Sequence, residues 1–153
     1  MKTKIIITLF LFISIVSFAQ LSNFDYSKSK ILSIKIQGID NIEKARYIDK
    51  QLLNSDEIIF VTTSSNDFIT TVIANQDFSF EKLNKLILSQ NHTCLLSSIS
   101  EFDNLVFEQL YSSVNFSKET ITKYGILKKY YTNNKTKDEL NFSKYQEIIG
   151  LKK

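Results

Sequence analysis

Several residue types that usually carry chemistry are scarce in this chain. Its 153 residues include one cysteine, one histidine and three glycines, and neither proline nor tryptophan. The single cysteine, Cys94, excludes an internal disulfide, and the single histidine, His92, is the one imidazole around which a serine or cysteine hydrolase triad would have to be built. Three glycines at positions 38, 125 and 150 cannot supply a Gly-rich phosphate loop. We therefore predict no catalytic residues, no cofactor and no enzyme activity.

Arginine and net charge are also scarce. Arg46 is the only arginine, and the formal net charge is +3, to which Lys2 and Lys4 contribute. Guanidinium is the group best suited to bidentate capture of phosphate, and near-neutral charge gives no support for binding a polyanion. We therefore expect no nucleic-acid partner.

Residues 1–19 are typical of a cleavable secretory signal peptide. Two lysines near the start are followed by an apolar run over 5–16, and small residues stand at the positions that a signal peptidase inspects, so we expect cleavage between Ala19 and Gln20. The alternative is an uncleaved anchor, but a membrane-spanning helix needs about 20 apolar residues. We expect an exported protein, in the periplasm or cell envelope or outside the cell, with no membrane span in the mature chain.

The mature chain divides into three segments by its pattern. Residues 20–30 are polar and predict a flexible arm, residues 31–99 predict a domain, and residues 100–153 predict a helical extension. Within the domain, strand patterns and helix patterns alternate, and we expect Asp40 and Ser79 to be the N-caps of its two helices. The predicted strands are 31–38, 58–63, 68–74 and 92–99, and the predicted helices are 40–53 and 79–91.

This order, β-α-β-β-α-β, predicts an α+β fold of the ferredoxin-like type followed by the C-terminal helical extension. In the extension, Ile121, Tyr124 and Leu127 have the spacing of one helix face, and a further short helix is expected over Lys144–Ile149.

Two copies of the sequence Asn-Phe-Ser-Lys, at 115–118 and 141–144, predict two helix starts in the extension. Each resembles the predicted helix start at Asp77-Phe78-Ser79, with a phenylalanine before a serine N-cap. The stretch over 123–137 is rich in lysine and tyrosine, and we interpret it as a solvated helix face rather than a nucleic-acid or membrane surface.

With Gly38 ending the first strand and a capped helix after it, the domain resembles the heavy-metal-associated domain of copper chaperones and metal-pumping ATPases. In that family a Cys-x-x-Cys pair follows the glycine, and its two thiolates bind a soft cation such as Cu(I). Asn41 and Lys44 occupy the two cysteine positions here. Because an ammonium group repels a cation, the resemblance implies the fold but not the metal site.

His92 and Cys94 form the one remaining pair of soft ligands. Residues two apart on a strand point to the same face, but a structural zinc site normally needs four ligands. Two interpretations stay open for Cys94: a thiol packed in the core beside a surface histidine, or an exposed thiol that forms an intermolecular disulfide.

The sequence therefore favours an exported, non-catalytic interaction module with a degenerate heavy-metal-associated domain and an unidentified protein partner. The alternative is a metal-handling protein in which His92 and Cys94 of two copies in a homodimer supply four ligands.

Overall fold

The computed structural model describes residues 24–114, 118–121, 127–130, 132 and 134–151. The predicted signal peptide and its cleavage point between Ala19 and Gln20 lie outside these residues, as do the first residues of the predicted arm. In the part of the chain that is described, no helix is long and apolar enough to span a membrane.

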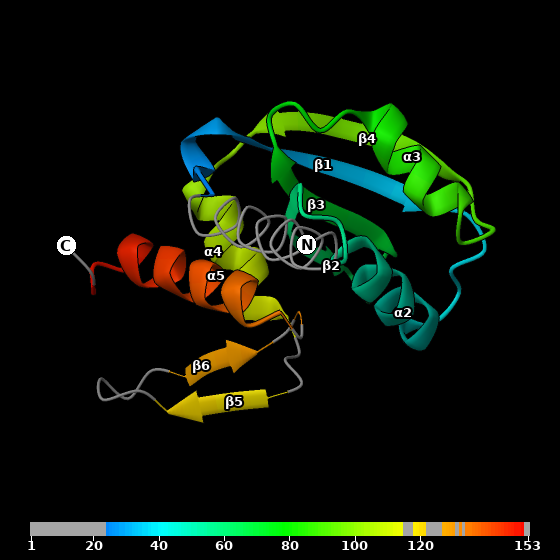
Figure 1. Cartoon of the computed structure of the whole chain (residues 1–153). Helices are drawn as coiled ribbons and strands as arrows, with labels where there is room; N and C mark the ends of the chain where they lie inside the picture. The colour runs from blue at the N-terminus through cyan, green and yellow to red at the C-terminus, as the bar shows by residue number, and fades with distance from the viewer. Residues whose placement is uncertain (1–23, 115–117, 122–126, 131, 133, 152–153) are drawn as a thin grey trace, which may run out of the picture.

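Residues 29–101 form an α+β unit around a four-stranded antiparallel sheet, which confirms the predicted class and order of elements (Figure 1). The strands lie in the order β2-β3-β1-β4, so β2 and β4 are the two edges of the sheet. The elements are β1 (Ser29–Ile36), α2 (Ile42–Leu52), β2 (Ile58–Thr63), β3 (Ile69–Asn75), α3 (Phe80–Leu88) and β4 (Cys94–Glu101).

The first residues of the unit differ from the prediction. Residues 26–30, expected in a flexible arm, are instead the short 3-10 helix η1 (Tyr26–Lys28) and the start of β1. Tyr26 is buried among the rings of Phe24, Phe102 and Phe107, and its hydroxyl donates to Asn141 Oδ1 at 2.9 Å. The polar composition predicted an arm because the buried tyrosine finds most of its partners, Phe102, Phe107 and Asn141, in the distant C-terminal segment.

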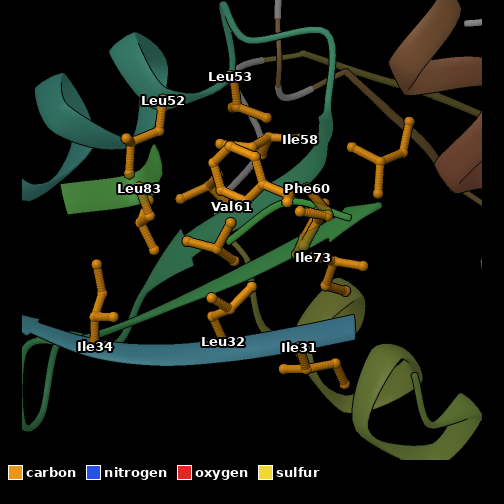
Figure 2. Close-up of a cluster of buried hydrophobic side chains, with 14 of the residues drawn as sticks. Ile31, Leu32, Ile34, Leu52, Leu53, Ile58, Phe60, Val61, Ile73 and Leu83 are labelled. Atoms are coloured by element: carbon orange, nitrogen blue, oxygen red, sulfur yellow. The ribbon is translucent and has the colours of Figure 1, made fainter. Parts of the chain in front are cut away.

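Apolar side chains from both helices and all four strands meet in one core. Figure 2 shows Leu32 of β1, Val61 of β2 and Leu83 of α3 in this cluster, and all three are fully buried. Burying one such side chain contributes roughly 1.5 to 3 kcal/mol, so the core is the main source of stability in a chain without disulfides.

The helix starts agree with the sequence in one case and differ by one residue in the other. Ser79 caps α3 as predicted, because its hydroxyl accepts the Lys82 amide at 3.2 Å. The predicted cap of α2 at Asp40 is wrong: Asn41 takes that role and accepts the Lys44 amide at 2.9 Å. Both residue types cap well, and the extended backbone of Asn41 directly before the first helical turn decides between them.

The C-terminal segment is not purely helical. It comprises α4 (Asn104–Ser113), the hairpin of β5 (Lys118–Ile121) and β6 (Leu127–Tyr130), and α5 (Lys135–Ile148) (Figure 1). The predicted helix through Ile121 and Leu127 is wrong, because these two residues face each other across the antiparallel hairpin. Tyr124 lies outside the described residues. Spacing alone misled here because the i, i+3 pattern had no cap at its start.

The two Asn-Phe-Ser-Lys sequences also start no helix. Lys118 begins β5, and residues 115–117 lie outside the described part of the chain. The copy at 141–144 lies inside α5, which begins earlier, after its N-cap Asn134. The helix expected over Lys144–Ile149 is thus the last part of α5.

Helix α4 packs against the face of β2 that is opposite α2. The Phe60 ring lies 5.9 Å from Phe107 and 6.2 Å from Tyr111, both in α4. Thr63, three residues along β2, instead contacts Asp49 of α2, and residues three apart on a strand point to opposite faces. All six residues of β2 are buried. The segment 100–153 therefore shares the core of the domain.

Lys137 joins α5 to the C-terminal end of α2. Its side chain is only 1% exposed, and Nζ donates to the backbone carbonyls of Leu53 at 2.6 Å and Ser55 at 2.7 Å. The last carbonyls of a helix lack partners within the helix and carry partial negative charge, so an ammonium group stabilises them. The interpretation of 123–137 as a solvated face is therefore wrong for Lys137, while Lys135 is exposed as expected.

Asn141, one turn further along α5, ties the same helix to the edge of the sheet. Its side-chain nitrogen donates to the Ile59 carbonyl of β2 at 3.0 Å, and its oxygen accepts the Tyr26 hydroxyl. Helix α5 therefore covers the β2 edge.

We expect Lys137→Met to lower the free energy of unfolding by roughly 1 to 3 kcal/mol, because the buried Leu53 carbonyl loses the Lys137 donor, while the half-buried Ser55 carbonyl keeps the Ile58 amide. Lys135→Met, in the same turn of α5, is the matched control and should stay within about 0.5 kcal/mol of the wild type. Urea unfolding followed by circular dichroism measures both. Equal effects of the two substitutions would contradict the role of Lys137.

The advantage of wild type over Lys137→Met should also depend on pH. Burial lowers the pKa of Lys137 to about 8 from its ordinary value of 10.5, against the opposing effect of Asp56. Between these values the unfolded chain binds more protons than the folded one, so the free energy of unfolding rises with pH. We expect the difference between the two proteins to increase as the pH rises from about 8 towards 10.5, measured in the same urea titrations.

Candidate functional site

Asn41 and Lys44, the positions at which the sequence resemblance would place metal-binding cysteines, both act at the start of α2. Asn41 caps the helix, and Lys44 Nζ forms an ion pair with Asp40 at 2.8 Å. Among the described residues, no group of three or more His, Cys, Asp or Glu side chains is placed to bind a metal ion. The loop after Gly38 thus has a structural explanation that needs no ligand.

The structure places His92 and Cys94 against different elements. Strand β4 begins at Cys94, so His92 precedes it, and the strand periodicity that would align the two side chains does not extend to His92. His92 Nδ1 lies 3.2 Å from the Gln37 carbonyl, beside Gly38, whereas Cys94 Sγ donates to Asn84 Oδ1 of α3 at 3.4 Å.

Cys94 is packed inside the domain. It is 8% exposed, and burial raises the pKa of its thiol. A raised pKa lowers the fraction of thiolate, which is the form that binds metals and attacks disulfides. The environment favours the first of the two interpretations, a thiol packed as a small apolar side chain.

A buried polar network surrounds the only arginine. Asp49 of α2 is fully buried and accepts the Thr63 hydroxyl at 2.6 Å and the Thr63 amide at 3.1 Å. Arg46 Nη1 lies 3.2 Å from Asp49 Oδ2 and 3.4 Å from Thr62 Oγ1. The network fixes α2 on β2, and the carboxylate of Asp49 balances the charge of Arg46.

Arg46 also lines a cleft of about 220 Å³ between α2, the β2–β3 hairpin and α4. Hydroxyl groups of Thr62, Ser64 and Ser113 line the cleft, but none of its lining residues is a histidine, cysteine or acid. The hydroxyl of Thr63, which also lines the cleft, donates to the Asp49 carboxylate that pairs with Arg46.

Among the described residues, no strand pairs with the outer edge of β4, the open edge of the sheet. β4 pairs with β1 on one side, and every residue from Leu95 to Glu101 is exposed. Three of these are large apolar side chains: Leu95 is 60% exposed, Leu96 41% and Ile99 50%. An edge strand with exposed apolar side chains is a template for pairing with another chain.

A bulge in β4 places two of these side chains together. Leu96 is opposite Ile34 of β1, and Ile99 is opposite Leu32, with the register shifted between them by one extra residue. Since Ile34 and Leu32 are two residues apart on β1, they point to the same face, and so do Leu96 and Ile99. Leu95, opposite Lys35, points to the other face.

Sequence reasoning predicted a strand over 92–99 but not its position at an edge. The mixture of serine with leucine and isoleucine over 95–100 was the available signal. It indicates a strand whose faces are only partly covered.

The chain matches no protein-family model, no curated protein and no solved structure.

We expect native Cys94 to react with a thiol reagent at least about tenfold more slowly than the same residue in urea, because the reagent must wait for local opening. Dithionitrobenzoate absorbance measures the rate. Ser65→Cys in a Cys94→Ala background supplies an exposed control thiol, which should react rapidly. Rapid reaction of native Cys94, or a disulfide-linked dimer on a non-reducing gel, would contradict its burial.

The same thiol tests the metal-handling alternative. If Cys94 is confined to a packing role, Cys94→Ser should leave the affinity for Cu(I) or Zn(II) unchanged in a competition titration. A loss of affinity that depends on Cys94 would instead favour a metal site shared between two copies.

Proposed function

We propose that this chain is an exported, non-catalytic binding module of the ferredoxin-like type that uses the open edge of β4 to bind another polypeptide. The resemblance to a degenerate heavy-metal-associated domain and the predicted leader motivate the first part of the proposal. The observation that carries the second part is the contrast between the two sheet edges.

The β2 edge has the protection that soluble proteins normally give to a sheet edge. Helix α5 lies against it, and Asn141 donates to the Ile59 carbonyl. The β4 edge has no lysine or proline, either of which would oppose strand pairing, and its residues after Cys94 are exposed. An edge left open beside one that is covered is consistent with selection for binding.

Strand addition is the mode of binding that fits such an edge. An extended segment of the partner would form main-chain hydrogen bonds with β4, and its side chains would contact Leu96 and Ile99 on one face and Leu95 on the other. This mode needs neither a deep pocket nor a catalytic group, in agreement with the surroundings of Arg46 and Cys94.

A photo-crosslinker on the strand tests the proposal. A benzophenone maleimide is attached to Leu95→Cys in a Cys94→Ala background, and the labelled protein is illuminated in total extract of the source cells. We expect a discrete adduct with a polypeptide, identified by mass spectrometry, because a strand partner lies within reach of Leu95.

Tyr47→Cys in the same background is the matched control. Tyr47 lies on α2, away from β4, and is 59% exposed, almost as much as Leu95. Absence of an adduct at Leu95, or the same adducts from both positions, would overturn binding at the β4 edge.

A further inference from the structure

We infer that the polypeptide bound at the β4 edge is a second copy of this chain, with the two β4 strands antiparallel across a two-fold axis. The inference rests on the proposed function, since it names the occupant of the same edge. Three features of the edge support a self-complementary interface.

The first feature is the apolar pattern of β4. Leu96 and Ile99 point to the same face and flank Ser97 and Ser98. If the two-fold axis passes between the serines, Leu96 of each copy lies opposite Ile99 of the other. In such an isologous contact both copies use the same surface, and the small serines permit close approach at the axis. The four apolar side chains would then form one row across the joint.

The second feature is the position of the single charge of β4. Glu101 is the only charged residue of the strand, at its C-terminal end, and its cross-strand neighbour on β1 is Lys30. Antiparallel pairing places the two Glu101 carboxylates at opposite ends of the joint, whereas parallel pairing would bring them together.

The third feature is the apolar surface of α3 beside the strand. Leu88 is 48% exposed and lies one helical turn after Asn84, on the side of the helix that faces Cys94. It adds a separate exposed apolar side chain beyond the Cys94 end of the strand. Because the bulge interrupts the backbone ladder at the axis, the apolar side chains carry much of the contact.

Sedimentation velocity on the chain without its predicted leader tests the inference. We expect a dimer that dissociates on dilution between about 200 and 5 µM, since oligomer populations follow mass action. Ile99→Lys should weaken dimerisation at least about tenfold, because an ammonium group would lie opposite Leu96 of the other copy. Tyr47→Lys, which removes a similarly exposed apolar side chain from α2, should leave the dimer unchanged.

Ser98→Lys is a second disrupting variant that removes no apolar side chain, and it should also give a monomer. Circular dichroism and the melting temperature establish that each variant is folded. If one variant fails to fold, the other decides the outcome.

Disulfide trapping tests the register. In a Cys94→Ala background, mixing Ser97→Cys with Ser98→Cys under mild oxidation should give a covalent dimer, because these positions are opposite each other at the proposed axis. Ser65→Cys, in the exposed turn between β2 and β3, is the control and should not crosslink at the same concentration. Crosslinking at Ser65 with none at β4 would overturn the inference.

A wild-type monomer throughout the concentration range would also overturn the second copy as partner. The Leu95 photo-adduct then separates the two proposals. A monomer that gives an adduct with a different polypeptide leaves the proposed function standing, whereas a monomer with no Leu95 adduct removes both.

Discussion

A sheet of four strands has two edges, and the backbone groups along each edge must find partners in the protein, in water or in another chain. In this fold helices α5 and α2 together supply partners for the β2 edge, since Asp49 of α2 accepts the Thr63 amide. Asn141 bonds to the β2 backbone, and Lys137 reaches the carbonyls at the end of α2. Placing an ammonium group in the interior costs desolvation energy, but the carbonyls of Leu53 and Ser55 compensate for it. The N-terminal half of the fold therefore depends on a helix from the C-terminal end.

The polar contacts along helix α2 hold it in place at its first turn, its middle and its end. Asn41 fixes its first turn, Asp49 binds the backbone and hydroxyl of Thr63 at its middle, and Lys137 binds the carbonyls at its end. The resemblance proposed from the sequence would place metal-binding cysteines at the first turn of this helix. In this structure Asn41 caps that turn and Lys44 forms an ion pair with Asp40. The polar residues of this region, Arg46 included, hold elements of the fold together. The sheet edge that no described strand pairs with is the opposite one, on β4.

The sequence predicted the domain better than the segment after it, and the reason is local. Residues 31–99 carry signals that agree with one another: alternation in the strands, a glycine after β1 and a serine N-cap at Ser79. In the C-terminal segment the signals conflict. Ile121 and Leu127 have helical spacing yet pair across a hairpin, and Asn-Phe-Ser-Lys at 141–144 has the form of a cap yet lies within α5. A short motif starts a helix only where the preceding backbone is extended, and that depends on where the previous element ends.

The candidate site was predictable only in outline. By itself the sequence determined the leader pattern, the absence of the Cys-x-x-Cys pair, the scarcity of histidine, cysteine and arginine, and the order of elements in the domain, because these follow from residue identity and local periodicity. Tertiary structure decided that Cys94 is packed under α3, that Lys137 is buried while Lys135 in the same turn is exposed, and that β2 is covered while the described residues leave the outer edge of β4 unpaired. Periodicity shows which residues share a face of a strand, but the position of a strand in a sheet depends on contacts between residues far apart in the chain. The exposed edge of β4 is a property of that arrangement.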